Sequence, residues 1–594
     1  MTARRAPRAG PAFLGGLGLL LGLIPGPIHA AAKVKIEVEG VRRDLERNIR
    51  SLLSLAQEDG DELDEARIRR LHAKAPEEIG EALQPFGYYK PQVRSTLERD
   101  GERWVATYDV EEGPAIRIAS VDLSIDGEGG NDPGFRAIAD EFPVRQGEVL
   151  FHPDYEQGKK ALVDRAAETG YLDAKFETRE VRVDLERYRA DVVVHYQTGP
   201  RYRFGDVRFV QDVLDPDLLV GYVTFKKGEP LDVNKVLELQ SALSDSPYWS
   251  RVEVVTRQEE AQGLEVPIEV NLVPAKTMRF SGGAGYGTDT GPRVSGAWEL
   301  RRINRRGHRG EVEVRASEIE QSLTTSYQIP GAYPRTDVVS LNTAYARKIT
   351  DTSESETGLV GAQRTQTRGG WREALSLTFQ REDFTVGLDR GISNLVVPGV
   401  SYERVKADDR IFTTHGYRLF GSLQGASASV LSDSSFLQAQ IEGKAIRTVG
   451  ERNRLIGRAQ IGYTQTDEFR ELPPRFRFFA GGDRSVRGYT YQGLGEPDEA
   501  GNVIGGEALL TGSLEYEYSL PDIRLFKFTL EKFGLAAFYD AGNACRDFSC
   551  ELEQGAGLGI RWLSPIGPIR ADVAFALTEP GRPLRFHLNI GPDL

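Results

Sequence analysis

Few residues of this sequence have the types and spacing that catalysis or metal binding requires. The histidines are widely dispersed, without the short spacing of a zinc site. Gly-x-Ser-x-Gly is absent, so an elbow-type hydrolase is unsupported. We therefore expect a protein that is not an enzyme and that uses no metal or other cofactor. The histidines are His29, His72, His152, His195, His308, His415 and His587.

Two glycine-rich segments differ from phosphate-binding loops in their spacing. A dinucleotide loop needs Gly-x-Gly-x-x-Gly at the start of a helix, where backbone amides meet the pyrophosphate. In residues 283–287 and 555–559 the glycines recur at every second position, which places each set on one face of a strand. We expect bends or close backbone approaches there, and no nucleotide site.

The only two cysteines, Cys545 and Cys550, lie five residues apart in the segment CRDFSC. No histidine lies within ten residues of them, so a zinc site is disfavoured. In an oxidising compartment the better interpretation is a local disulfide.

Length and charge narrow the class of protein further. A chain of 594 residues predicts two or more domains. Its formal charge is −13, and its basic residues are scattered among acidic ones, which argues against a nucleic-acid partner.

Residues 1–32 have the pattern of an export signal. Arg4, Arg5 and Arg8 precede an apolar run over residues 13–24, and small residues follow at 30–32. The run is short for a spanning helix, so cleavage is favoured over a retained anchor. Later windows lack a spanning apolar stretch, which leaves a soluble protein, a peripheral protein or a β-barrel.

Residues 33–276 mix helical and strand periods, and they repeat. The segments FGYYKPQV, TGYLDAKF and SPYWSRVEV mark corresponding points of three units of roughly 80 residues. We place the units at 33–114, 115–200 and 201–276. Each reads as strand, helix, helix, strand, strand, and in the second unit the long helix is expected to end at Gly170.

Residues 277–594 lose the helical period and alternate polar and apolar residues in segments of about ten residues. In LRFHLNIG, residues 584–591, the apolar side chains face one way and Arg585, His587 and Asn589 face the other. A soluble sandwich alternates similarly. The length of the region favours a transmembrane barrel of about 16 antiparallel strands.

Residues 480–493, AGGDRSVRGYTYQG, stand between strand patterns, with about five further strand patterns after them. GGDRSVRGY resembles the VRGF/Y signature in the long loop of the barrel-assembly and two-partner-secretion superfamily. SLEYEYSLP (513–521), FYDAGN (538–543) and GIRWLSPIGPIRAD (559–572) resemble that family's following strands in the same order. The three units resemble its POTRA modules.

The resemblance implies roles for five residues. Arg487 is the loop arginine, Gly488 its turn and Tyr489 the last residue of the motif, while Glu515 and Asp540 are the acidic partners on the barrel wall. An arginine inside a barrel needs such carboxylates, because an unpaired desolvated guanidinium is costly. Lysine cannot form the same fork-shaped pairs. The alternative is a surface turn whose charges face water.

The resemblance also implies a seam between the first and last barrel strands that opens laterally. The first strand, residues 278–288, is rich in glycine, which weakens packing along the seam. The expected seam residues are Gly282, Gly283, Gly285, Gly287, Phe586, Leu588 and Ile590.

Three units before a barrel are most similar to the translocation-and-assembly branch of this family. That resemblance implies a non-enzymatic insertase or translocase of the bacterial outer membrane. Its clients would be autotransporters and other outer-membrane barrels, and phospholipid is a further cargo. Its POTRA units, in the periplasm, would bind a large inner-membrane-anchored protein that spans the periplasm, by adding a strand to an open sheet edge.

Two other functions remain open from the sequence. A two-partner-secretion pore predicts two POTRA units and an N-terminal plug helix, and no plug pattern precedes the first unit. A barrel lipid hydrolase would bring a serine and a histidine together in space, and it leaves the three units unexplained.

Overall fold

The computed structural model describes residues 33–591 except 59–62, 102, 410, 522, 526–527, 531 and 565–566. The expected signal peptide, residues 1–32, lies outside the described residues. Among the helices described, none is both long and apolar enough to cross a membrane. The chain divides into two compact units, one of residues 1–203 with 230–233 and one of residues 204–229 with 234–594.

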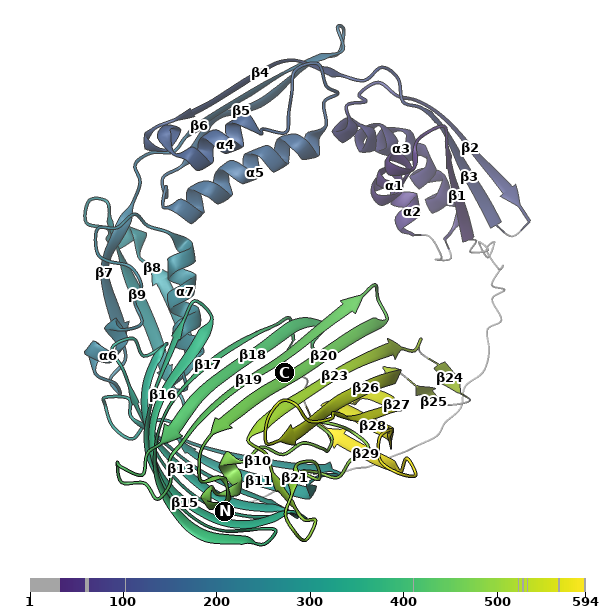
Figure 1. Ribbon diagram of the computed structural model, residues 1–594. Coiled ribbons are helices and arrows are strands. Elements are labelled where there is room, and N and C mark those ends of the chain that lie inside the picture. The colour runs from purple at the N-terminus through teal and green to yellow at the C-terminus, as the bar shows by residue number, and fades with distance from the viewer. Residues whose placement is uncertain are drawn as a thin grey trace, which may run out of the picture. The chain divides into compact units, whose positions relative to one another are not determined.

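The first module is a three-stranded sheet with helices on one face (Figure 1). Its middle strand β3 pairs in parallel with β1 and antiparallel with β2. A four-residue helix, α2, is an addition to the expected order. The elements are β1 (Lys33–Glu39), α1 (Arg43–Leu52), α2 (Ser54–Gln57), α3 (Glu65–Leu83), η1 (Gln84–Phe86), β2 (Gln92–Asp100) and β3 (Arg103–Glu111).

Alternation along β3 builds the core of this module. Trp104, Tyr108 and Val110 are buried, and because they lie an even number of positions apart they share the face that meets the helices. Ile49 of α1 and Ile79 of α3 are fully buried against them. Each such aliphatic side chain contributes about 1.5–3 kcal/mol when it leaves water.

The second module repeats this plan in the strand order β4-β6-β5. Helix α5 ends at Gly170, whose φ of +87° is the left-handed conformation that glycine adopts without strain. The expected helix end is therefore confirmed. The elements are β4 (Arg117–Asp126), η2 (Glu128–Asn131), α4 (Pro133–Asp140), α5 (His152–Thr169), β5 (Lys175–Asp184) and β6 (Arg189–Gln197).

The third module has the strand order β7-β9-β8 and contacts the barrel directly. The Tyr248 hydroxyl donates to the Gly307 carbonyl at 2.5 Å, and the Asp215 amide donates to the Arg305 carbonyl at 2.8 Å. These contacts fix the module to the turn after β11. Its elements are β7 (Arg203–Val210), α6 (Pro216–Val220), α7 (Val233–Ser244), β8 (Trp249–Thr256), η3 (Gln258–Glu260) and β9 (Glu265–Pro274).

After the third module, sixteen of the described strands form a closed antiparallel barrel, as expected (Figure 1). In chain order these strands are β10 (Met278–Gly287), β11 (Gly291–Leu300), β12 (Arg309–Ser317), β13 (Glu320–Pro330), β14 (Asp337–Ile349), β15 (Ser353–Arg368), β16 (Trp371–Val386), β17 (Asp389–Ala407), β18 (His415–Ala426), β19 (Phe436–Val449), β20 (Asn453–Gln465), β23 (Ala508–Ser519), β26 (Phe533–Cys545), β27 (Glu553–Ser564), β28 (Gly567–Ala576) and β29 (Leu584–Ile590).

Side chains alternate between the two faces of this barrel. On β23, Leu510, Leu514 and Tyr516 are exposed on the outside, while Glu515 and Glu517 are buried on the inside. The outer face is therefore apolar and the lumen polar, which is the arrangement that lipid on one side and water on the other require.

The first module generates a prediction about pH. The Nδ1 atom of His72 lies 3.0 Å from the Tyr108 hydroxyl, and burial lowers the pKa of His72. In the unfolded chain the imidazole takes up a proton near its ordinary pKa of about 6.5. The unfolded state therefore binds more protons there, and stability is lost as the pH falls through that value.

We expect residues 33–114 to unfold at a lower urea concentration at pH 5.5 than at pH 7.5. Unfolding is measured by the fluorescence of Trp104, the only tryptophan in that segment. His72→Asn should reduce this pH dependence. An equally steep dependence in the variant would contradict the assignment to His72.

Candidate functional site

The connection between β20 and β23, residues 466–507, turns into the barrel lumen and carries the VRGY motif. Ala480 and Leu494 pair in an isolated bridge, so the segment between them forms a closed loop. Gly481 and Gly482 have φ of +98° and +100°, a left-handed backbone that other residues rarely adopt. The chain reverses there, and residues 486–489 are buried against the wall.

Arg487 lies in a pocket built from three carboxylates and one aromatic ring. Its Nε and Nη2 atoms donate to the two oxygens of Asp540 at 2.7 and 2.9 Å. Its Nη1 atom donates to Glu515 at 2.7 Å and to Asp572 at 3.1 Å. Its Cζ atom lies 3.4 Å from the ring centre of Phe538. The fork-shaped pair with Asp540 uses geometry that only arginine supplies.

The backbone around Arg487 touches the wall because two glycines leave room. The Arg487 amide donates to Asp540 at 3.1 Å. Gly488 has φ +100°, and a Cβ there would lie 2.9 Å from the Ala576 amide nitrogen. A Cβ on Gly555 would overlap the Arg487 carbonyl oxygen. The spacing of residues 555–559 therefore marks a close approach of backbone to backbone.

A second buried arginine, Arg561 of β27, shares two of these carboxylates. It donates to Glu515 at 2.6 Å, to Glu517 at 2.8 Å and to Asp572 at 2.5 Å. Glu515 and Asp572 each bridge two guanidinium groups. Because these groups are at most 8% exposed, each charge depends on its partners to offset the loss of hydration.

Tyr489 anchors the end of the motif. Its hydroxyl donates to Glu553 at 2.9 Å and lies 2.6 Å from the Thr578 hydroxyl. The motif therefore also contacts the start of β27 and Thr578, which lies two residues after the end of β28.

The structure brings together Arg487, Gly488, Tyr489, Glu515 and Asp540, which the sequence singled out as a set. It adds three buried charged residues that the sequence analysis did not single out, namely Glu517, Arg561 and Asp572. A signal for all three was present, because Glu517 belongs to the segment SLEYEYSLP and Arg561 and Asp572 belong to GIRWLSPIGPIRAD. Two charged residues at lumen-facing positions of adjacent strands are candidates for an ion pair.

The barrel closes through a short seam. Among the described residues, β10 and β29 share a single ladder pair, Gly287 with Asn589. Beside it, the Thr288 amide donates to the Leu588 carbonyl and the Leu588 amide to the Thr288 hydroxyl, both at 3.1 Å. Strands β10 and β11, in contrast, pair along the whole length of β10.

Of the expected seam glycines, Gly282, Gly283 and Gly285 pair with β11. A Cβ on Gly285 would meet the Arg293 side chain. Arg293 of β11 passes over this glycine and donates to the Ile590 carbonyl of β29 at 2.8 Å. Glycine on β10 therefore makes room for a hydrogen bond that reaches across the seam.

Phe586 and Leu588 of β29 flank the inward-facing His587. Phe586 is 55% exposed and projects from the outer face, where a barrel strand meets lipid. Leu588 contributes its backbone to the seam.

A polar cluster joins the loop to this seam. Asp483 of the loop accepts from the Thr288 hydroxyl at 3.0 Å and lies 2.5 Å from His587 Nδ1. The Asp483 amide donates to Asp289 at 2.6 Å, and the Gly488 amide donates to His587 Nε2 at 3.1 Å. The loop thus contacts β29 and the turn after β10, on the two sides of the seam.

Asp289, Asp483 and His587 lie close enough for a metal ion. However, His587 Nε2 accepts a hydrogen bond from the Gly488 amide, so Nδ1 carries the ring proton and donates to Asp483. To bind a metal through Nδ1, the ring would have to lose that proton while Nε2 keeps its hydrogen bond from the Gly488 amide. The cluster is a hydrogen-bonded link between the loop and the seam.

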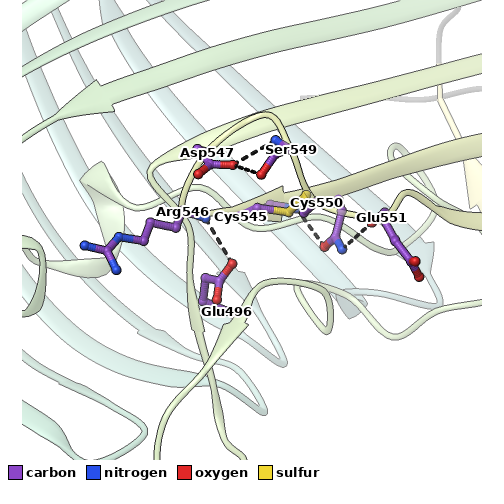
Figure 2. Close-up of a disulfide and its surroundings, with 9 residues drawn as sticks. Glu496, Cys545, Arg546, Asp547, Ser549, Cys550 and Glu551 are labelled. Carbon is purple, nitrogen blue, oxygen red and sulfur yellow. Dashed lines mark hydrogen bonds between the residues drawn. A yellow bond between two sulfur atoms is a disulfide. The ribbon is translucent and has the colours of Figure 1, made fainter.

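The loop between β26 and β27 is closed by a disulfide between Cys545 and Cys550 (Figure 2). The Arg546 amide donates to Glu496 of the long loop at 3.0 Å. The Asp547 carboxylate accepts from the amide of Ser549 at 2.8 Å inside the disulfide ring. This closed loop therefore supports the far end of the segment that carries the motif.

Comparisons with known proteins agree with this architecture. Residues 303–593 match the family described as the Omp85 superfamily domain, and residues 35–112 match the family described as POTRA domain TamA domain 1. In a crystal structure of BamA from Haemophilus ducreyi lacking POTRA domains 1–3, the similar fold covers 80% of this chain and 99% of that chain, with a TM-score of 0.66 and 17% identity.

Two proteins named outer membrane protein assembly factor BamA are similar in sequence. The one from Nitratidesulfovibrio vulgaris is 24% identical over 81% of this chain, and the one from Neisseria meningitidis serogroup B is 23% identical over 85%. The matches span 62% and 70% of those proteins. Homology and the closed barrel place this chain in the outer membrane, with its POTRA modules in the periplasm.

The arginine pocket generates a prediction about stability. Arg487→Ala leaves Asp540 buried without its main partner, so we expect a loss of about 3–5 kcal/mol. Arg487→Lys and Asp540→Asn should also destabilise the barrel, because neither keeps the fork-shaped pair. The measurement is the temperature at which the barrel loses its compact gel migration.

The control is Arg347→Ala, which removes a half-exposed arginine of β14 paired with Glu354 and should change stability by at most about 0.5–1 kcal/mol. Equal unfolding temperatures for Arg487→Ala and the control would contradict the importance of the pocket.

The polar cluster generates a prediction about the seam. His587→Ala removes both the Asp483 and the Gly488 contacts, so the seam should separate more often. We expect a lower yield of the disulfide formed by Gly287→Cys with Asn589→Cys in this background. Phe586→Ala, on the outer face of the same strand, should leave the yield unchanged. An unchanged yield in His587→Ala would show that the cluster does not hold the seam.

Proposed function

Since the chain carries an Omp85 superfamily domain and a POTRA domain and is homologous to BamA, we propose that it is a TamA-like subunit of an outer-membrane translocation and assembly module. It inserts client barrels, autotransporters among them, without catalysing a chemical reaction. Its POTRA modules are residues 33–114, 115–200 and 201–276, and its barrel is 277–594.

The observation that carries this proposal is the single ladder pair at the seam. Residues 278–286 of β10 pair with β11 on one side and, among the described residues, have no ladder partner on β29. A strand edge with free backbone groups is a template for another strand. A client strand can therefore pair with β10 and lead its own barrel into the membrane.

The arginine pocket supports this role because it keeps the loop in the lumen. Arg487 and Tyr489 attach the loop to four strands on the side of the barrel next to β29. A two-partner-secretion pore must instead pass a soluble client through the lumen, which would require these buried contacts to break. The structure thus favours lateral insertion over transport through the lumen.

The contacts of His587 also bear on the hydrolase alternative. Both of its ring nitrogens are engaged, one with Asp483 and one with the Gly488 amide. A histidine that activates a serine needs one nitrogen for the hydroxyl. His587 is therefore assigned to the seam and not to a catalytic pair.

The periplasmic modules would bind a large, inner-membrane-anchored, TamB-like protein. Each sheet has edge strands, among them β2, β5 and β8, where a partner strand can be added. Phospholipid is a second cargo that the same lateral opening would admit, since the opening faces the lipid of the outer membrane.

Locking the seam tests the proposal. Opposite residues of an antiparallel pair have Cα atoms about 4.5–5.5 Å apart, a span that a disulfide bridges. Gly287→Cys with Asn589→Cys should abolish assembly of an autotransporter barrel in proteoliposomes, and reduction should restore it. Assembly is measured by the heat-modifiable migration of the client.

The matched control is a lock between strands that stay paired, Gly296→Cys of β11 with Val314→Cys of β12. It should leave assembly unchanged, and it also reports any effect of reducing the native disulfide. Full activity of the locked seam would overturn the insertase proposal.

A further inference from the structure

The outer wall of the barrel carries a groove of 720 Å³ that crosses the strands from β11 to β17. The wall is hollow there because outward positions of four consecutive strands carry small residues. These are Gly310, Thr325, Thr343 and Ala362, one on each strand from β12 to β15. The Thr325 and Thr343 hydroxyls lie 2.6 Å apart and hydrogen-bond to each other, so the floor of the groove suits an apolar chain.

The groove is long enough for a lipid chain. A row of directly opposed outward residues lines it from Leu300 on β11 to Leu377 on β16, which is five strand spacings. At about 4.7–4.9 Å each, these spacings make a path of roughly 24 Å. One leaflet accounts for about 15 Å of the hydrocarbon core of a bilayer, so the acyl chain of one leaflet fits along this path.

The β11 end of the groove lies at the periplasmic boundary of the membrane, because the third module contacts the turn after β11. Trp298 of β11 stacks on Phe280 of β10 with their ring centres 6.3 Å apart. The Tyr327 hydroxyl lies 2.6 Å from Nδ1 of His308 in the turn. Aromatic rings with a polar tip gather at the height of lipid headgroups. This end of the groove therefore meets the headgroups of the periplasmic leaflet.

The turn itself, residues 301–308, closes this end of the groove. The Ile303 amide donates to the His308 carbonyl at 2.7 Å. A Cβ on Gly310 would lie 3.2 Å from Cδ1 of Ile303, so the isoleucine covers the end of the groove floor. On the other side of the turn, Arg305 donates to Asp215 of the third module at 3.2 Å. The turn is thus fixed between the groove and the third module.

Two further arginines of the turn are not used in fixing it. Arg302 and Arg306 stand on either side of the exposed Ile303 in the sequence, and Arg306 is itself exposed. Their side chains form neither an ion pair nor a hydrogen bond with any residue that the structure describes. The end of an apolar groove is therefore bordered by positive charge that the described protein groups leave without a partner.

We propose that the groove and this turn bind one phospholipid with an anionic headgroup, its chain along the groove and its phosphate beside Arg302 and Arg306. Basic side chains next to a membrane attract anionic headgroups, whereas the ammonium of a zwitterionic lipid meets like charge there. The groove is continuous with the lipid-facing wall, so a lipid covers it in the membrane. This ligand goes beyond the proposed function, because it is bound outside the barrel and does not depend on an opening of the seam.

The test uses the purified full-length chain in a non-ionic detergent, with bound lipid counted by native mass spectrometry during a titration. The probes are palmitoyl-oleoyl phosphatidylglycerol and palmitoyl-oleoyl phosphatidylethanolamine, which share their chains and differ in charge. We expect phosphatidylglycerol to bind about tenfold more tightly. Arg302→Gln with Arg306→Gln should remove this preference and leave the binding of phosphatidylethanolamine unchanged.

Matched controls separate the two parts of the site. Arg94→Gln with Arg182→Gln removes two exposed arginines of the first and second modules and should leave lipid binding unchanged. Thr343→Phe fills the floor of the groove and should weaken the binding of both lipids. Ala439→Phe, at an exposed outward position of β19 away from the groove, should weaken neither.

Three results would overturn the site. The first is equal affinity of the wild type for the two lipids, and the second is unchanged phosphatidylglycerol binding in the arginine variant. The third is an equal loss in the Arg94 and Arg182 control, since binding would then follow net charge alone. Displacement of the lipid by sn-glycerol 3-phosphate at the same concentration as by intact phosphatidylglycerol would also overturn it, in favour of a site for free phosphate esters. Heat-modifiable migration checks folding, and Arg306→Gln alone, in the exposed turn, keeps the test valid if Thr343→Phe fails to fold.

Discussion

The arrangement of the barrel depends on the cost of burying the Arg487 guanidinium. A charge removed from water costs several kcal/mol unless carboxylates and hydrogen bonds surround it. Asp540, Glu515 and Asp572 provide that surrounding, and Arg561 in turn neutralises the carboxylates that Arg487 leaves partly unmatched. The loop and the strands of this wall are therefore stable only together.

This dependence extends from the wall to the seam. Gly488 follows Arg487 directly, and its amide holds the ring of His587 on the last strand. His587 and Asp483 then reach Thr288 beside the first strand. Because one ladder pair joins these strands in the described residues, side-chain and loop contacts carry much of the closure. Displacing the loop and opening the seam are consequently linked events, as the proposed lateral insertion of a client requires.

Charge is divided between two sides of the lumen. The wall from β23 to β28 is rich in carboxylates and holds the arginine of the motif. The wall from β18 to β20 carries Arg418, Lys444 and Arg458 at directly opposed positions. The loop therefore lies between a carboxylate-rich side, which holds its arginine, and a side that carries several cations.

The sequence by itself determined the class of fold and part of the site. Alternation over residues 277–594, the repeats over 33–276 and the glycine at 170 depend on local backbone geometry, so they can be interpreted without a structure. The motif and its family resemblance led to Arg487, Glu515 and Asp540. Tertiary structure alone decided that Arg561 pairs with Asp572, that His587 contacts Asp483, and that Arg293 crosses above Gly285. Those contacts depend on the register and closure of sixteen strands, which bring together residues hundreds of positions apart and leave little local trace in the chain.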